Sequence, residues 1–189
     1  MLMRDAADVS LKDFDFMFEN STVKVVANRN SPEITIADLK VGPFEEGNEY
    51  ELLFWVAHEL EKARIVRFRR EEMLDMQQLH KIHWKERVQG ISRMAELPED
   101  FYPRLRRYLA RLRENALKNP DKMREYMKAS QLARDIINNR VKKVVSLASI
   151  PTPTNQFLKN LTAEERVLYE RLHEIISSWR RQILEGDGK

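Results

Sequence analysis

The chain has 189 residues, 33% of them charged, and a formal net charge of +3. This length suits one domain or two small ones with a buried core. The lack of cysteine excludes disulfides, thiolate zinc sites and cysteine nucleophiles, and no glycine-rich phosphate loop occurs. No apolar run approaches the roughly twenty residues of a membrane span, and the N-terminus lacks the apolar core of a signal peptide. We therefore expect a soluble, cytoplasmic protein without cofactors.

The charge is divided unevenly along the chain. Residues 1–63 carry 6 Lys or Arg and 13 Asp or Glu, whereas residues 64–189 carry 27 and 17. An acidic first part and a basic second part predict two units with different partners, and solvated helix faces are the alternative interpretation. Abundant charges of both signs, together with the missing cysteine, are typical of hyperthermophile proteins.

The first third of the chain predicts a small α+β module. Residues 11–18 are rich in aromatic side chains and are expected to form a short helix or an arm packed on the module. Thr22–Val26 and Glu33–Ile36 alternate polar and apolar side chains and include β-branched residues, which predicts two strands. Turn-forming residues lie between them, so the two strands are expected to pair as a hairpin.

A Gly-Pro-Phe turn follows at residues 42–44, where the Gly-Pro pair forces a change of direction and presents Phe44 in a set orientation. From Leu52 the apolar spacing becomes helical, and Arg64–Phe68 returns to alternation. The module therefore continues with a short helix and a further strand. Phe44 and Trp55 are expected to be buried in its core.

The rest of the chain predicts a bundle of about four long helices. The first carries residues at helical spacing, with Trp84 and Val88 continuing near their face: Met73, Met76, Leu79, His80 and His83. It is expected to end at Gly90. The second runs from about Glu99, where acidic residues complement the positive end of the helix dipole, to about Lys118. Its apolar face lies opposite a run of arginines.

The third helix, expected from Met123 to Ser149, carries an apolar stripe that is wider than one neighbouring helix requires. It should therefore be central in the bundle. A proline-containing segment then leaves helical conformation. Thr162 and Glu165 form a capping box at the start of the fourth helix, which should end at Gly186.

The first part of the chain contains, in order, a strand, a Gly-Pro-Phe turn, a further glycine, an apolar helix and a basic strand. Eight residues before the basic strand define this order: Leu39, Gly42, Pro43, Phe44, Gly47, Trp55, Ala57 and Leu60. This order resembles the small β-rich domain of GINS DNA replication complex subunits. The similarity is to the archaeal type in which the small domain precedes the helical domain, the class related to the eukaryotic Psf-two and Psf-three subunits. It implies a mainly α fold with a small N-terminal α+β module, a β-rich (B-type) domain at residues 1–68 and a helical (A-type) domain at residues 71–189.

The resemblance also implies a function. A protein similar to these subunits is a non-enzymatic structural component of chromosomal DNA replication. It would join a related GINS subunit of reversed domain order in a two-plus-two heterotetramer. The assembly would bridge and activate the MCM helicase together with a RecJ-like partner at the replication fork, with an indirect or weak contact to DNA.

Residue patterns for catalysis or metal binding are weak. His80 and His83 are three residues apart with Glu86 nearby, but the H-E-x-x-H arrangement is absent, so structural histidines are favoured over a metal site. No G-x-S-x-G turn occurs to expose a serine nucleophile. We therefore predict no catalytic, metal or cofactor site.

Apolar helix surface in excess of what one small bundle can bury predicts a permanent subunit interface, without recourse to the resemblance. The second and third helices are expected to form it, with these contacts: Leu105, Tyr108, Leu112, Met127 and Ile137 at the centre, and Arg107 and Arg111 aligning the partner. The alternative is a stand-alone basic helical nucleic-acid-binding protein that uses the arginine run from Arg104 to Arg113. That run lacks the interleaved exposed aromatic residues of single-strand binders.

Overall fold

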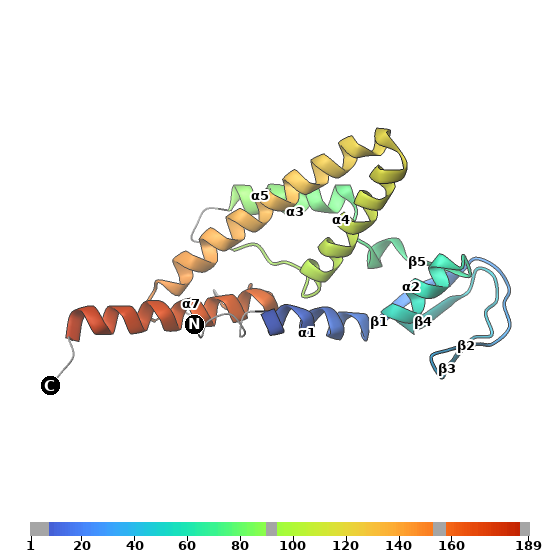
Figure 1. Cartoon of the computed structure of the whole chain (residues 1–189), viewed down its shortest axis with the longest axis horizontal. Helices are drawn as coiled ribbons and strands as arrows, with labels where there is room; N and C mark the ends of the chain where they lie inside the picture. Colours follow the sequence, from blue (N-terminus) through green and yellow to red (C-terminus); the bar gives the residue numbers. More distant parts are fainter. Residues whose placement is uncertain (1–7, 90–93, 153–157, 186–189) are drawn as a thin grey trace. The chain divides into compact units, whose positions relative to one another are not determined.

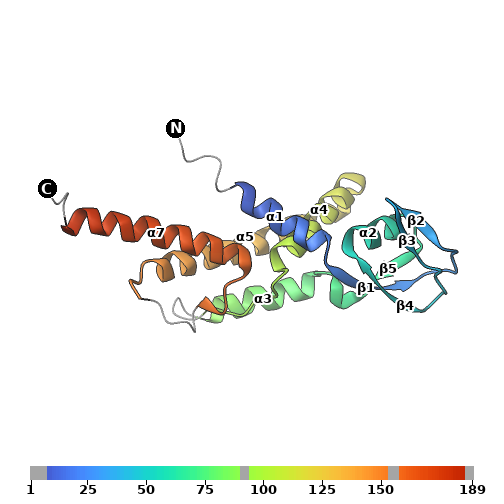
Figure 2. The ribbon, with the colours of Figure 1, turned by 90° about the horizontal axis from the view of Figure 1, so that it is seen from below.

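A computed structural model describes residues 8–89, 94–152 and 158–185. The chain divides into two compact units, residues 1–74 and residues 75–189. The first unit contains the strands and the second is helical (Figures 1 and 2). The division falls a few residues after the expected domain boundary, and the expected helix ends at Gly90 and Gly186 lie outside the described residues.

The first unit is built on a three-stranded antiparallel sheet with the order β4–β1–β5. β1 (Thr22–Ala27) is the central strand, and its alternate residues are buried. β4 (Glu49–Leu53) pairs with one edge of β1, and β5 (Val66–Phe68) pairs with the other. Sequence reasoning missed β4 because its last two residues were assigned to the following helix.

A separate two-stranded hairpin joins β2 (Ile34–Ile36) to β3 (Leu39–Val41). Its two turn residues, Ala37 and Asp38, have φ values of 46° and 67°. Such two-residue turns match the right-handed twist of the strands that they join, so β2 pairs with the strand that directly follows it. The expected hairpin between β2 and β1 is therefore wrong.

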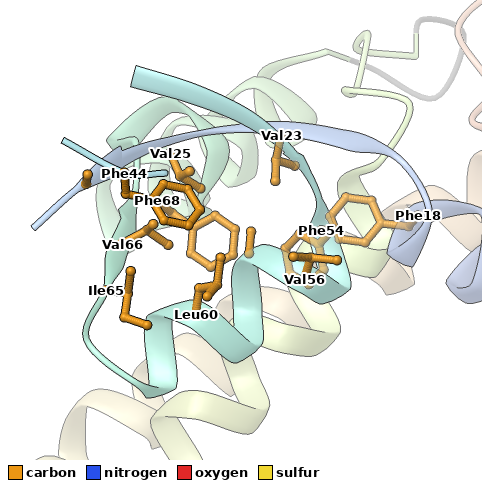
Figure 3. Close-up of a cluster of buried hydrophobic side chains, with 12 residues drawn as sticks. Phe18, Val23, Val25, Phe44, Phe54, Val56, Leu60, Ile65, Val66 and Phe68 are labelled. Atoms are coloured by element: carbon orange, nitrogen blue, oxygen red, sulfur yellow. The ribbon is translucent and has the colours of Figure 1, made fainter. Parts of the chain in front are cut away.

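The core of the first unit lies between the sheet and α2 (Phe54–Lys62) (Figure 3). The ring of Phe54 lies 4.7 Å from that of Phe18 in α1 (Asp8–Glu19) and 5.2 Å from that of Phe68. Trp55, expected in the core, is only partly buried and packs against the cluster. The helix begins at Phe54 instead of Leu52, which turns Phe54 and not Trp55 toward the sheet.

Backbone conformation and steric contacts explain why a glycine occupies the first position of the Gly-Pro-Phe turn. Gly42 has a φ of +97°, and a Cβ added there would lie 3.2 Å from the ring of Phe44. The Gly42–Pro43 peptide bond is cis. Phe44 is 1% exposed, and its backbone exchanges two hydrogen bonds with Ser31. The GINS-like residues thus fall into three sets: Phe44, Ala57 and Leu60 are buried, Trp55 is partly buried, and Leu39, Gly42, Pro43 and Gly47 are exposed.

The second unit is arranged around α5 (Met123–Ala148), which contacts α3 (Met76–Val88), α4 (Phe101–Lys118) and α7 (Ala163–Glu185). The expected central position of this helix is confirmed. α4 packs on α5 and buries five of the six residues expected on its apolar face: Phe101, Leu105, Tyr108, Leu112 and Ala116. The sixth, Leu109, is partly buried.

A buried cluster of charged side chains connects the helices of the second unit. Arg140 of α5 is 1% exposed. Its guanidinium donates to Glu86 of α3 at 2.9 Å and to both carboxylate oxygens of Glu165 in α7. It also donates to the backbone carbonyl oxygens of Ala95 at 2.6 Å and Asn160 at 2.9 Å. One side chain thus satisfies acceptors on four separate segments.

The two carboxylates of this cluster receive further hydrogen bonds. Lys143 donates to Glu86 at 2.8 Å, and the hydroxyl of Tyr102 donates to Glu165 at 2.6 Å. Burial and the negative charge of Glu165 raise the pKa of Tyr102 far above its ordinary value, so the hydroxyl keeps its proton. Burial alone would lower the pKa of Arg140, but its interactions with Glu165 and Glu86 raise it.

The predicted capping box at the start of α7 is confirmed. The backbone N–H of Glu165 donates to the hydroxyl of Thr162 at 3.3 Å, and the N–H of Thr162 donates to the carboxylate of Glu165 at 3.1 Å. The same carboxylate therefore caps the helix and binds Arg140, which couples the start of α7 to α5.

The buried cluster also determines which face of α3 is buried. Leu79 of the expected face is buried, but the continuation of that face through Trp84 and Val88 is wrong: both side chains are exposed, and the other buried residue of the helix is Glu86. Leu79 and Glu86 are seven residues apart and therefore lie on one side of the helix. Because Glu86 reaches Arg140 from that side, Trp84 is turned outward.

We predict that Phe54→Ala lowers the stability of the first unit by about 3–5 kcal/mol, because it removes the central ring of the core. Trp55→Ala should cost about 1 kcal/mol, because this ring lies at the edge of the cluster. Native-state hydrogen exchange at the amides of β1 measures this unit separately from the helical one. A loss for Trp55→Ala as large as that for Phe54→Ala would contradict the assignment of the core.

Candidate subunit interface

Three of the residues predicted at the centre of a subunit interface lie inside the helical unit. Leu105, Tyr108 and Leu112 are 3%, 4% and 6% exposed, because the apolar face of α4 packs on α5. A partner cannot reach these side chains while the unit is folded. That part of the predicted interface is therefore wrong.

The other predicted interface residues are more accessible. Met127 and Ile137 of α5 are exposed, as is Arg111 of α4. Arg107 is partly buried and donates to the carbonyl oxygen of Pro103 at 3.2 Å. Met127, Ile137 and Arg111 stay predicted contacts, and α5 supplies the apolar ones.

A line of exposed aliphatic side chains extends the surface around Ile137. Val141 and Val145 follow it at intervals of four residues, and all three are about two-fifths exposed. This spacing places them on one side of α5, next to the residues that pack on α7. We call Ile137, Val141 and Val145 the α5 stripe.

A second apolar surface occupies the later part of α7. Ile175, Trp179, Ile183 and Leu184 are each more than half exposed, and the first three repeat at intervals of four residues. We call these four residues the α7 face. Sequence reasoning assigned the interface to the second and third helices and did not include these residues.

The α7 face is exposed because α7 continues beyond the end of α5. The two helices run in the same direction: Arg140 binds Glu165, and further along both helices the carbonyl oxygen of Ala148 lies 3.1 Å from the imidazole of His173. α5 ends at Ala148, whereas α7 continues to Glu185 (Figures 1 and 2). The last twelve residues of α7, about 18 Å of helix, therefore extend past the end of α5.

The size of these apolar side chains argues for a protein partner. Complete burial of one such side chain is worth about 1.5–3 kcal/mol, and contiguous exposed patches of this kind mark association sites. The indole of Trp179 lies between two isoleucines at helical spacing, which is the arrangement of an anchor residue at the centre of an interface. The α7 face and the α5 stripe are therefore the best candidates for subunit contacts.

The described residues contain no group of three or more side chains that could hold a metal ion. Of the histidines considered for one, His80 is exposed and His83 lies 3.8 Å from Asp135. Glu86, the nearby carboxylate, is bound by Arg140 and Lys143. None of the helices that the structure describes has the length and apolar content to cross a membrane.

We predict that the chain purified alone self-associates through its uncovered apolar surface. The double substitution Trp179→Lys and Ile183→Lys should shift it toward monomer, because the charges cannot be buried between two copies. Sedimentation velocity measures the distribution of species.

The matched control is Leu117→Lys with Val88→Lys, which changes two exposed apolar residues outside the α5 stripe and the α7 face. It should leave the distribution unchanged. A parent chain that stays monomeric at high concentration, or a control that dissociates it equally well, would contradict the assignment of the α7 face.

A comparison with protein families matches residues 69–184 to the helical bundle domain of GINS complex proteins (Sld5). No curated protein gave a significant match. The matched segment contains α3, α4, α5 and α7, and so the buried Arg140 cluster and both apolar surfaces. GINS proteins are structural components of a DNA replication complex, and other GINS subunits are their partners. The match covers more than half of the sequence, and the chain therefore belongs to the GINS family.

Proposed function

We propose that this chain is the GINS subunit of the archaeal type in which the small β-containing domain precedes the helical domain, as in the class related to Psf-two and Psf-three. The observation that carries this proposal is the position of the family match. It begins at residue 69, and a separate compact unit with a sheet occupies the residues before it.

The proposed partner is a related GINS subunit of reversed domain order, in a two-plus-two heterotetramer. The α5 stripe and the α7 face supply the apolar centres of the contacts, and Arg111 of α4 and Met127 in the first part of α5 are further proposed contacts. Two surfaces on one helical unit allow each chain to contact two neighbours, as a closed four-subunit assembly requires. The interface is apolar and built on rigid helices, as is usual for permanent complexes.

The function proposed for the assembly is to bridge and activate the MCM helicase together with a RecJ-like partner on the chromosome, without catalysis by this chain. The first unit supports this proposal by its composition. Residues 1–63 carry 13 acidic and 6 basic side chains, a charge distinct from that of the helical unit. An acidic module on a subunit that assembles through its helices is suited to contact a different partner.

The test is co-expression of this chain with the GINS subunit of reversed domain order from the same organism. Size-exclusion chromatography with light scattering should give the mass of two copies of each chain. Trp179→Lys with Ile183→Lys, and separately Val141→Lys with Val145→Lys, should each reduce the assembly to a smaller species. Leu117→Lys with Val88→Lys is the matched control and should assemble normally.

Three outcomes separate the parts of this proposal. If no complex forms with the parent chain, the proposed partner is wrong. If a complex forms and neither double variant changes its mass, the assignment of the interface to α5 and α7 is wrong. If the mass fits one copy of each chain, the two-plus-two arrangement is wrong.

A further inference from the structure

The outward side of α3 combines one aromatic ring with several cations. The large ring of Trp84 is 64% exposed. Lys81 and Arg87 lie three residues before and after it, on either side of the ring, and Lys85 lies at the edge. All three cations are exposed, and none has a carboxylate partner among the described residues. We call Lys81, Trp84, Lys85, Arg87 and Val88 the Trp84 face.

No exposed acid within α3 balances these cations. Glu86 is its only acidic residue, and it is buried and bound by Arg140 and Lys143. On the neighbouring α5, Asp135 lies beside His83, on the side of α3 that turns toward α5. The Trp84 face is therefore locally positive, and its ring is available to a ligand from outside.

The composition of this face differs from that of a protein interface. Interface centres are depleted in lysine and join several apolar side chains, as the α7 face does. On α3, Val88 is the only large aliphatic neighbour of Trp84 on the exposed side, and the positions around it carry lysine and arginine. An exposed ring between cations is instead the combination that stacks a nucleobase and neutralises the phosphates beside it.

We propose that the Trp84 face binds single-stranded nucleic acid. The indole stacks on one unpaired base, and Lys81 and Arg87 contact the backbone phosphates on either side, about 9 Å apart along the helix axis. A single strand is required because a base in a duplex has both of its faces stacked. This gives the chain a direct contact with nucleic acid, on a helix that carries none of the proposed subunit contacts.

The first test measures binding of the full-length chain to a fluorescent oligothymidylate of about 12 nucleotides, by anisotropy at low salt. Trp84→Ala should weaken binding about 5- to 150-fold, because stacking on one aromatic ring is lost. Trp84→Phe should restore most of the affinity, because a phenyl ring also stacks. Leu117→Ala is the control, an exposed apolar residue of the same unit that lies outside the α5 stripe, the α7 face and the Trp84 face, and should bind like the parent.

The second test separates local cations from the overall basic charge. The logarithm of the binding constant should fall with the logarithm of salt concentration, by about 0.7 for each phosphate neutralised. Lys81→Gln with Arg87→Gln should therefore reduce the slope by about 1.4. Lys118→Gln with Arg124→Gln removes the same charge from α4 and α5 and should leave the slope unchanged.

Four results would overturn the proposal. The first is no binding of the oligonucleotide at low salt, and the second is equal affinity for Trp84→Ala and the parent. The third is an equal reduction of the salt-dependence slope in both charge variants. The fourth is tighter binding to a duplex than to the single strand. A Trp84→Ala chain that binds the oligonucleotide normally but fails to assemble with its partner subunit would show that this face is a protein contact instead.

Discussion

The guanidinium of Arg140 lies where α5 meets α3, α7 and two connecting segments, and it is inaccessible to water. An unpaired charge in such a place is very costly, whereas a paired one adds little to stability over well-packed apolar residues. The cluster therefore acts mainly as a constraint on arrangement. Glu86, Glu165 and the carbonyl oxygens of Ala95 and Asn160 must all approach Arg140 together. This requirement restricts how α3 and α7 can be oriented about α5.

The orientation imposed by this cluster determines the surfaces on which function depends. Because Glu86 points inward, the opposite side of α3 carries Trp84 and its cations to the surface. Because Glu165 ties the start of α7 beside Arg140, α7 runs along α5 and passes its end, which leaves Trp179 uncovered. The subunit surface and the proposed nucleic-acid surface are thus set by one group of buried charges. They lie on different helices, so one subunit can use both.

Elements that depend on local sequence signals could be predicted, and those that depend on tertiary pairing could not. The central helix, the apolar face of α4 and the Thr162 capping box follow from helical spacing and capping chemistry. The continuation of the buried face of α3 through Trp84 and Val88 was predicted wrongly, because a buried glutamate is indistinguishable from a surface one until its partner, 54 residues away, is known. Leu105 and its neighbours were assigned to an interface for the opposite reason: an apolar face shows that something covers it, but not whether that cover is α5 or another chain.

The most direct test of this account is a double-mutant cycle between Arg140 and Glu86. Arg140→Met, Glu86→Met and the double variant are compared by chemical denaturation, followed through the helical circular dichroism. Each single substitution should cost about 3–5 kcal/mol, because it leaves a buried charge without its partner. The double variant should cost less than the sum by at least about 1 kcal/mol. Additive losses would show that the two side chains do not depend on each other, and would contradict the claim that this cluster sets the arrangement of the helical unit.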